Sequence, residues 1–408
     1  MEIYYKILEK TYEFFEYNFT YEKGLNTITG YTGISEKETQ NGFWITKLAH
    51  IKEFYGRGTT LATIKLPVDD LDFQMTIHDN YWRSNKIIIC EEFPLYDIKT
   101  YEKFGLDILK NTYIVNFASR DSNIDFLNWW LASGLELRYS NYAIEYASLR
   151  GHIKVLDWWL NSGLELRYDH YAIVNASSHG HPEVLDWWLN SGLELRYSHY
   201  AIEWASAQGR VNVLDWWLNS GLELRYDNYA ITGASSNSHV KVLDWWFNSG
   251  LELRHNHYAI DDASSHGHQN VLDWWLKSGL QLRYSNRALE LALCNNQINV
   301  LDWWLKSGLE LRYNEWTIAR ASECGCINVL NWWLKSGLEL KYNAEAIDRA
   351  IRWNTRESVK WWIKSGLDLK CTKDIIQWAC EQGHLDILEL WHEMNLPFGS
   401  KKNALASL

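Results

Sequence analysis

Apolar and polar positions recur with a period of 29 residues from residue 111 onward. In residues 169–197, Tyr171, Ile173 and Ala176 are apolar at helical spacing and predict a short first helix. Residues 184–189 are apolar on most of a helical circumference, which predicts a second helix that is buried on more than one side. Each 29-residue repeat is therefore expected to be an antiparallel helix pair.

Residues that begin and end helices stand at fixed places in the same repeat. Asp169 is a helix-capping residue type, and the corresponding place holds Ser, Asp, Asn or Thr in the other repeats. Gly180 and Gly192 permit the left-handed backbone that ends a helix, and Pro182 suits a first helical turn. The stretch 193–197 alternates apolar and charged residues, which predicts an extended segment.

Pairs of adjacent tryptophans mark the second helix of most repeats. They begin at residues 129, 158, 187, 216, 245, 274, 303, 332 and 361. Self-similarity of this period is typical of stacked-repeat proteins, and residues 111–400 hold 290/29 = 10 repeats. Aromatic side chains can stack on bases or sugars, but the constant size and register favour a core role. We expect the pairs to be buried, with their two members facing differently because adjacent helical residues lie about 100° apart.

Residues 1–93 do not repeat and carry a different pattern. Residues 3–17 have apolar positions at helical spacing and predict a helix, and residues 24–33 predict a loop from their Gly, Asn and Thr content. Residues 59–67 and 86–90 predict strands. We therefore expect a small α+β domain over residues 1–93, a repeat region over residues 94–400 and a tail over residues 401–408.

Composition narrows the classes of partner and the compartment. The formal net charge of −11 argues against nucleic acid, since phosphate binding needs a basic face. No apolar run approaches the roughly 20 residues that span a bilayer, and the N-terminus lacks a signal-peptide pattern. The six cysteines do not follow the repeat, which indicates reduced thiols. We expect a monomeric cytoplasmic protein that binds neither a membrane nor a cofactor.

Candidate chemistry is sparse. Asp69, Asp70 and Asp72 could bind a hard cation, but they lack the Gly and distal Glu of a calcium loop, and a solvated loop is the more common case. The histidine-rich turns do not supply three or four converging metal ligands. Cys324 and Cys326 lack a second cysteine pair. We expect no catalytic residue and no metal site.

The repeat resembles the ankyrin repeat. Gly180-His181 corresponds to the G-H of that family, residues 184–189 to its apolar second helix, and residues 192–196 to its G-A-D-V-N. The 29-residue length is shorter than the family's roughly 33, which implies a trimmed turn between repeats. The T-P-L-H sequence is lost, and with it the hydrogen bonds that its Thr and His supply in the family. Residues 42–75 are similar to the leader domain of ankyrin-repeat proteins of mimivirus-type giant viruses. The resemblance implies a viral protein made in a eukaryotic host cell.

One position of the first helix varies while the rest of the repeat is nearly constant. The resemblance implies that this position faces the groove where ankyrin-like stacks bind partners. Its charge changes sign along the chain, although neutral variation on a solvated face explains the pattern as well. The candidate protein-binding residues are Tyr146, Asn175, Trp204, Asp262, Arg320 and Arg349.

These observations predict a mainly α, ankyrin-like α-solenoid with a small N-terminal α+β domain. The function expected is a non-catalytic scaffold for protein–protein interaction, binding a host protein through the groove. The alternative is an enzyme whose active site lies in the N-terminal domain, with repeats that recruit substrate. A third possibility is a purely structural virion component. A deep polar pocket in the N-terminal domain would favour the enzyme.

Overall fold

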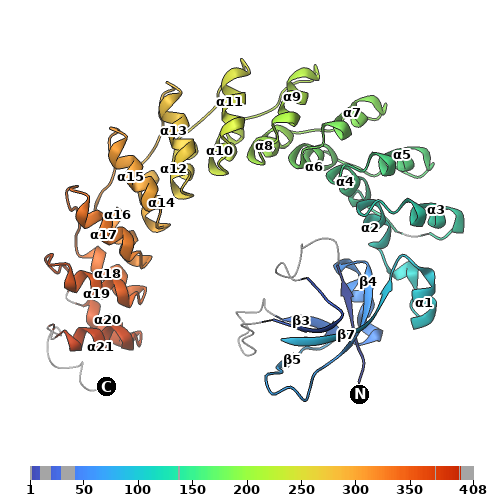
Figure 1. The fold of residues 1–408 in the computed structure, drawn as a ribbon, viewed down its shortest axis with the longest axis horizontal. Helices are drawn as coiled ribbons and strands as arrows, with labels where there is room; N and C mark the ends of the chain where they lie inside the picture. The colour runs from blue at the N-terminus through green and yellow to red at the C-terminus, as the bar shows by residue number, and fades with distance from the viewer. Residues whose placement is uncertain are drawn as a thin grey trace. The chain divides into compact units, whose positions relative to one another are not determined.

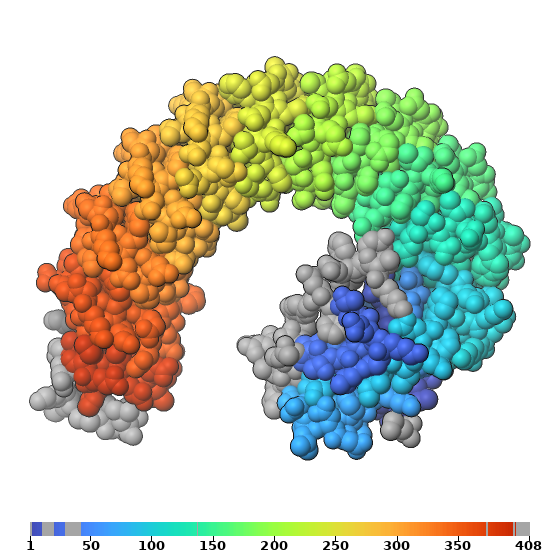
Figure 2. Space-filling model, viewed as in Figure 1, coloured from blue at the N-terminus to red at the C-terminus, as the bar shows by residue number. Residues whose placement is uncertain are grey.

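The computed structural model describes residues 2–9, 20–28, 42–136, 138–372, 374–394 and 396. It divides into two compact units, residues 1–197 and 198–408, which we call the N-terminal half and the C-terminal half. Within the described residues, the N-terminal half holds a β-sheet and three complete helix pairs, and the C-terminal half holds seven helix pairs (Figure 1). Figure 2 shows the same chain with all atoms filled, coloured from blue at the N-terminus to red at the C-terminus. The ten repeats predicted from the period are therefore confirmed.

The N-terminal half begins with a seven-stranded antiparallel sheet in the order β2-β7-β4-β1-β3-β6-β5. Its core includes Leu8, Phe43, Ile64 and Ile87. The sheet ends at Pro94, and helix α1 begins at Ile98. The strands are β1 Tyr4–Leu8, β2 Gly24–Thr27, β3 Phe43–Thr46, β4 Thr60–Lys65, β5 Met75–Ile77, β6 Tyr81–Ser84 and β7 Lys86–Pro94, with the 3₁₀ helix η1 at Leu48–Arg57.

Two predictions for this region were wrong. Within the stretch predicted as a helix, Tyr4–Leu8 is a strand whose residues pair with β4 from Tyr4↔Ile64 to Leu8↔Thr60. A central strand with apolar residues on both faces has no clear alternation, so its short apolar run imitates helical spacing. Within the predicted loop, Gly24–Thr27 pairs with β7. Residues 10–17 and 29–33 of these stretches lie outside the described residues, whereas the strands predicted at 59–67 and 86–90 are confirmed as β4 and β7.

The helices follow the predicted frame. In the N-terminal half they are α1 Ile98–Phe104, α2 Ile114–Arg120, α3 Ile124–Ser133, α4 Tyr142–Leu149, α5 Ile153–Asn161, α6 Tyr171–His179 and α7 Pro182–Asn190, with the short 3₁₀ helix η2 at Ile108–Lys110. In the C-terminal half they are α8 Tyr200–Ala207, α9 Val211–Asn219, α10 Tyr229–Ser236, α11 Val240–Asn248, α12 Tyr258–Ser265, α13 Gln269–Lys277, α14 Arg287–Cys294, α15 Ile298–Lys306, α16 Glu315–Glu323, α17 Ile327–Lys335, α18 Glu345–Arg352, α19 Arg356–Lys364, α20 Ile375–Glu381 and α21 Leu385–Glu393.

The helix boundaries follow from the predicted capping residues. The Asp169 carboxylate accepts a hydrogen bond from the Tyr171 backbone N–H at 2.7 Å, which satisfies one of the free donors at the start of α6. Gly180 ends α6 with a φ of 86°, a left-handed conformation that glycine adopts without steric cost. Pro182 occupies the first turn of α7, as predicted.

The two tryptophans of a pair have different environments. The second member is buried in every pair, with at most 4% of its surface exposed. In most repeats its indole N–H donates to a serine on the first helix of the preceding repeat, as Trp188 does to Ser148 and Trp246 to Ser206. The first member is mostly half-buried, and its N–H donates to a second-helix carboxylate or amide one repeat earlier, as Trp245 does to Asp215 at 2.7 Å. The pairs thus join each repeat to the one before it.

The second helix is less completely buried than its sequence predicts. Leu189 follows the tryptophan pair in α7 and is 42% exposed. The equivalent residues of most other repeats are exposed to a similar degree. The side chains at 184, 185 and 188 fill the contact with the neighbouring helices, so the residue after the pair lies outside that contact. The prediction that this helix is buried around most of its circumference was therefore wrong at this position.

The extended segments between repeats are held by charged side chains. Arg254 pairs with Glu252 of its own segment at 2.9 Å and donates to the Tyr226 carbonyl of the preceding segment at 3.0 Å. Its guanidinium also lies 5.0 Å from the centre of the Tyr226 ring. The recurring Glu and Arg therefore serve the stack, and an exposed pair of this kind contributes about 0–1 kcal/mol.

Candidate functional site

The variable residues lie at the fifth position of their first helices, or at the sixth in the case of Arg320 in α16, and the structure exposes one of them strongly. Trp204, in α8, is 41% exposed. The other five candidate residues, Tyr146, Asn175, Asp262, Arg320 and Arg349, are half-buried. Trp204 is therefore the member of this set with a large apolar surface open to solvent.

In each half, exposed aromatic residues accompany the variable position on the first helices. Tyr171, one of the residues whose spacing predicted this helix, begins α6 and is 39% exposed. Ala172 and Ile173 take the buried positions instead. The other exposed aromatic residues that begin a first helix are Tyr142, Tyr200, Tyr229 and Tyr258, and Trp316 is the second residue of its helix.

The first tyrosine and the variable residue share one helix face because they are four residues apart. In the N-terminal half, Tyr142 and Tyr146 are stacked with ring centres 5.6 Å apart. In the C-terminal half, Tyr200 and Trp204 lie 5.7 Å apart. Sequence reasoning missed the tyrosines because it sought residues that vary, and these are constant through five repeats.

An aromatic surface results on the first helices at the start of the C-terminal half. We call Tyr200, Trp204, Tyr229 and Tyr258 the aromatic patch. Tyr229 is the most open of the four at 66% exposed. The ring centres of His199 and His257 lie 4.2 Å from those of Tyr200 and Tyr258, respectively.

Asp262 and Asn175 are partly engaged within the stack. The Asp262 carboxylate accepts from the Ser236 hydroxyl of α10 at 3.2 Å. The Asn175 backbone carbonyl accepts from the Ser178 hydroxyl at 3.1 Å. Both residues are half-buried, so the exposed part of each side chain can contribute to a contact without dominating it.

Arg320 and Arg349 form an ion-pair network with three carboxylates. Glu323 is 9% exposed and contacts both guanidinium groups. Arg320 also lies 3.8 Å from Glu290, and Arg349 lies 3.5 Å from Glu345. The change of sign seen in the sequence is thus locally compensated, which reduces its value for orienting a partner.

Asp70 of the acidic cluster and His268 of a histidine-rich turn, both considered for metal binding, make structural contacts. Asp70 pairs with Lys86 at 2.7 Å, and its pKa is lowered, first by this hydrogen bond. The His268 ring contacts the Ser236 carbonyl, which lies in α10, the first helix of the preceding repeat, at 3.0 Å. Within the described ranges, no three His, Cys, Asp or Glu residues converge on a possible metal position. Nor does any helix in that part of the chain have the length and apolarity needed to cross a bilayer.

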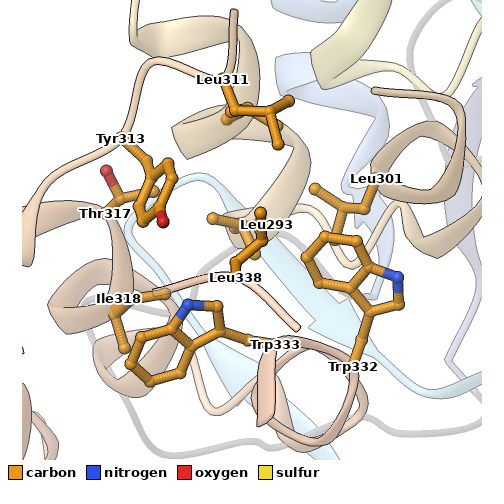
Figure 3. A pocket seen from close by; sticks show the side chains of 10 residues that line it. Leu293, Leu301, Leu311, Tyr313, Thr317, Ile318, Trp332, Trp333 and Leu338 are labelled. Carbon is orange, nitrogen blue, oxygen red and sulfur yellow. The ribbon is translucent and has the colours of Figure 1, made fainter. Parts of the chain in front are cut away.

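A small apolar cavity lies at the joint between α14 and α16, where the buried serine is replaced by Leu293. The Trp333 indole N–H has no hydrogen-bond partner, whereas a serine hydroxyl at position 293 would accept a hydrogen bond from it. Its ring lies 6.3 Å from Tyr342 and 6.4 Å from Trp362, both of later segments. Figure 3 shows the nitrogen edge of Trp333 toward apolar side chains, and the cavity of about 20 Å³ is large enough for a single water but offers it no polar wall.

Comparison with known proteins shows partial relationships. No model of a known protein family matches the chain. An uncharacterized protein of Acanthamoeba polyphaga mimivirus is 42% identical over 90 residues, which make up 22% of this chain and 29% of that protein. A second protein of the same virus, named for its ankyrin repeats, is 29% identical over 125 residues, or 29% of this chain and 38% of that protein. The chain thus spans well under half the length of these relatives.

The solved structures include similar chains. The crystal structure of the ankyrin repeat domain of human ASB11 is 14% identical, with a TM-score of 0.36, over 42% of this chain and 86% of that chain. The predicted resemblance to mimivirus ankyrin-repeat proteins is confirmed by the sequence similarity to the mimivirus protein. The mainly α solenoid with a small N-terminal α+β region is confirmed by the helices and strands themselves.

Proposed function

We propose that this chain, an ankyrin-like repeat protein related to proteins of a mimivirus, is a non-catalytic scaffold that binds a protein of the host cell. The binding surface is centred on the aromatic patch of the C-terminal half, and the complex forms in the host cytoplasm. Asp262 lies on the same row of first helices and favours a partner with a basic group beside its apolar anchor. In the N-terminal half, Tyr146 and Asn175 occupy the same position of the repeat and are the candidate contact residues of that half.

The exposed indole of Trp204 is the observation that supports this proposal. The stack does not require an apolar residue there, since the equivalent positions hold Asn175 and Gly233. Large aromatic side chains on rigid elements lose little conformational freedom on binding and dominate many interfaces. Trp204 stands beside Tyr200 on a helix whose opposite face is buried, so the pair is held in place before a partner arrives.

The test compares two surfaces of the same repeats. The Tyr200→Ala/Trp204→Ala variant is expected to keep its far-ultraviolet circular dichroism and lose the host proteins that co-purify with the wild-type chain. The matched control is Leu218→Ala/Phe247→Ala, which removes exposed apolar residues from second helices. The control is expected to retain those proteins.

A second variant tests how much Arg320 and Arg349 contribute to partner binding. Arg320→Ala/Arg349→Ala is expected to weaken recovery less than the aromatic variant, because Glu290, Glu323 and Glu345 already neutralise both charges. Equal recovery by the aromatic variant and the wild type would contradict the proposed surface. Loss of the partners from the second-helix control alone would place recognition on the other face of the repeats.

A further inference from the structure

Two cysteines meet at the joint between the first helices α14 and α16. Cys294 is the last residue of α14, and Cys324 follows the last residue of α16. The two are 30 residues apart, and the pair at the same places one repeat earlier, Ser265 and Asn295, is hydrogen-bonded side chain to side chain at 2.8 Å. The stacking of the helices therefore places the two thiols next to each other. The Cys326 Sγ lies 3.2 Å from the Cys294 carbonyl and 3.8 Å from the Cys324 carbonyl, so the backbones of both cysteines meet at this joint.

Cys326 lies nearby but has a different role. Its Sγ is 3.2 Å from the Cys294 backbone carbonyl. The same place in other repeats holds His268 and Thr355, whose side chains contact the carbonyls of Ser236 and Ser322, each at 3.0 Å. Cys326 thus replaces a structural hydrogen-bonding residue, which separates it from the Cys294 and Cys324 pair.

We propose that Cys294 and Cys324 are a redox-active pair that closes to a disulfide when the protein meets hydrogen peroxide. The Cys324 thiolate attacks one peroxide oxygen, the O–O bond breaks, and hydroxide leaves with the electron pair and becomes water. Cys324 is then a sulfenic acid. The Cys294 sulfur attacks the Cys324 sulfur, the S–O bond breaks, and the departing hydroxide takes the Cys294 proton. Two thiols and one peroxide thus give one disulfide and two waters.

The surroundings of the two cysteines determine which thiol reacts with peroxide and which one then forms the disulfide. Cys324 is exposed and Cys294 is half-buried, so peroxide reaches Cys324 first. The neighbouring Cys294 thiol, and after it the Arg320 guanidinium, lowers the pKa of Cys324 to about 7 against the effect of burial. A thiol with such a pKa is partly thiolate at neutral pH, which is the reactive form. Cys294 keeps its proton until it acts as the resolving thiol.

The location gives the disulfide a structural effect. The same joint carries Leu293 in place of the buried serine, so Trp333 makes no hydrogen bond there. A covalent link between α14 and α16 restrains the joint that lacks this contact. Oxidation is therefore expected to slow amide hydrogen exchange in both helices, and reduction by a dithiol is expected to restore it.

The experiment treats the dilute full-length chain with hydrogen peroxide and maps its peptides by mass spectrometry without reduction. The expected product is a Cys294–Cys324 cross-linked peptide that disappears on reduction. Cys326→Ser should give the same peptide. Cys294→Ser should instead accumulate a Cys324 sulfenic acid that dimedone traps, and Cys324→Ser should protect Cys294 from oxidation.

Several outcomes would overturn the proposal. A Cys324–Cys326 or intermolecular disulfide in place of the expected one would show that the thiols at the joint do not pair. Equal trapping of Cys324 sulfenic acid in the wild type and in Cys294→Ser would show that Cys294 does not resolve it. Circular dichroism of each variant confirms that these results concern a folded chain, and Cys90 and Cys380, both half-buried, are the internal measure of general thiol oxidation.

Discussion

The indole N–H of Trp304 donates a hydrogen bond to the hydroxyl of Ser264, which is 3.1 Å away and 40 residues earlier in the chain. Both side chains are buried. Ser264→Ala leaves the indole donor without a partner and is expected to lower the free energy of unfolding by about 1–3 kcal/mol. Urea denaturation followed by circular dichroism measures this loss.

The control for this prediction is Trp304→Phe, which has no N–H to satisfy. In that background Ser264→Ala is expected to cost much less, and the difference between the two costs isolates the bond. An equal cost in both backgrounds would show that the serine acts by packing alone.

The two members of a tryptophan pair are expected to differ in their effect on stability. Trp246 is fully buried, and its truncation to alanine leaves a cavity that costs about 3–5 kcal/mol. Trp245 is half-buried and donates to Asp215, so Trp245→Ala is expected to cost clearly less. Matched urea titrations of the two variants check the order, and a reversed order would contradict the described orientation of the pair.

Glu203 predicts a pH dependence of stability. Burial, and to a smaller degree the neighbouring Asp227, raises the pKa of Glu203 to about 7 from an ordinary value of 4.5. The folded chain therefore holds this proton more tightly than the unfolded chain. The resulting stabilisation is fully present below pH 4.5 and is lost as pH rises toward 7.

Glu203→Gln removes this ionisation and tests the sign. At pH 8 the variant is expected to be more stable than the wild type by up to about 3 kcal/mol, and at pH 4.5 the difference should vanish. Urea denaturation at both pH values measures it. Glu252→Gln, at an exposed site, controls for the loss of one negative charge. A variant that is less stable at pH 8 would contradict the prediction.

Gly233 occupies the variable position of α10 where two first helices approach closely. A Cβ added there would lie 2.8 Å from the Cβ of Ala207. Because the Ala207 Cβ is attached directly to the helix backbone, it cannot move aside as the end of a longer side chain could. Gly233→Ala is expected to destabilise the chain by about 1–3 kcal/mol despite the better helix propensity of alanine. In an Ala207→Gly background the clash disappears, so the same substitution should become stabilising. Thermal denaturation of the four chains checks this reversal.

The repeat architecture could be predicted from sequence because its signals agree at every level. The 29-residue period, the capping residue at Asp169 and the turn at Gly180 all indicate the same helix pair, and the structure has it. The N-terminal sheet was predicted less well. Tyr4–Leu8 is defined by its pairing with β4, about 55 residues later, and a local pattern does not contain that contact.

The candidate surface shows a second limit of sequence reasoning. Variation along the chain located Trp204, whose exposure is confirmed. The same criterion passed over Tyr229, because a constant residue is easily taken for part of the core. It also selected Arg320 and Arg349 without showing Glu323 between them, since that contact depends on which side chains the stacking brings together.

Hydrogen-bonded residues of neighbouring repeats are separated by the same number of residues along the chain, so one repeat can take the place of another. Trp303 and Trp304 bond to Asp273 and Ser264, while Trp274 and Trp275 bond to Asp244 and Ser235 in the same way. Loss of residues 256–284 would therefore bring Trp303 against Asp244 and Trp304 against Ser235, with every donor meeting an acceptor of the same kind. The chain can thus gain or lose whole repeats of this kind while the tryptophan hydrogen bonds between the remaining repeats are kept. The number of first helices, and with it the number of variable surface residues, can change without a change of fold.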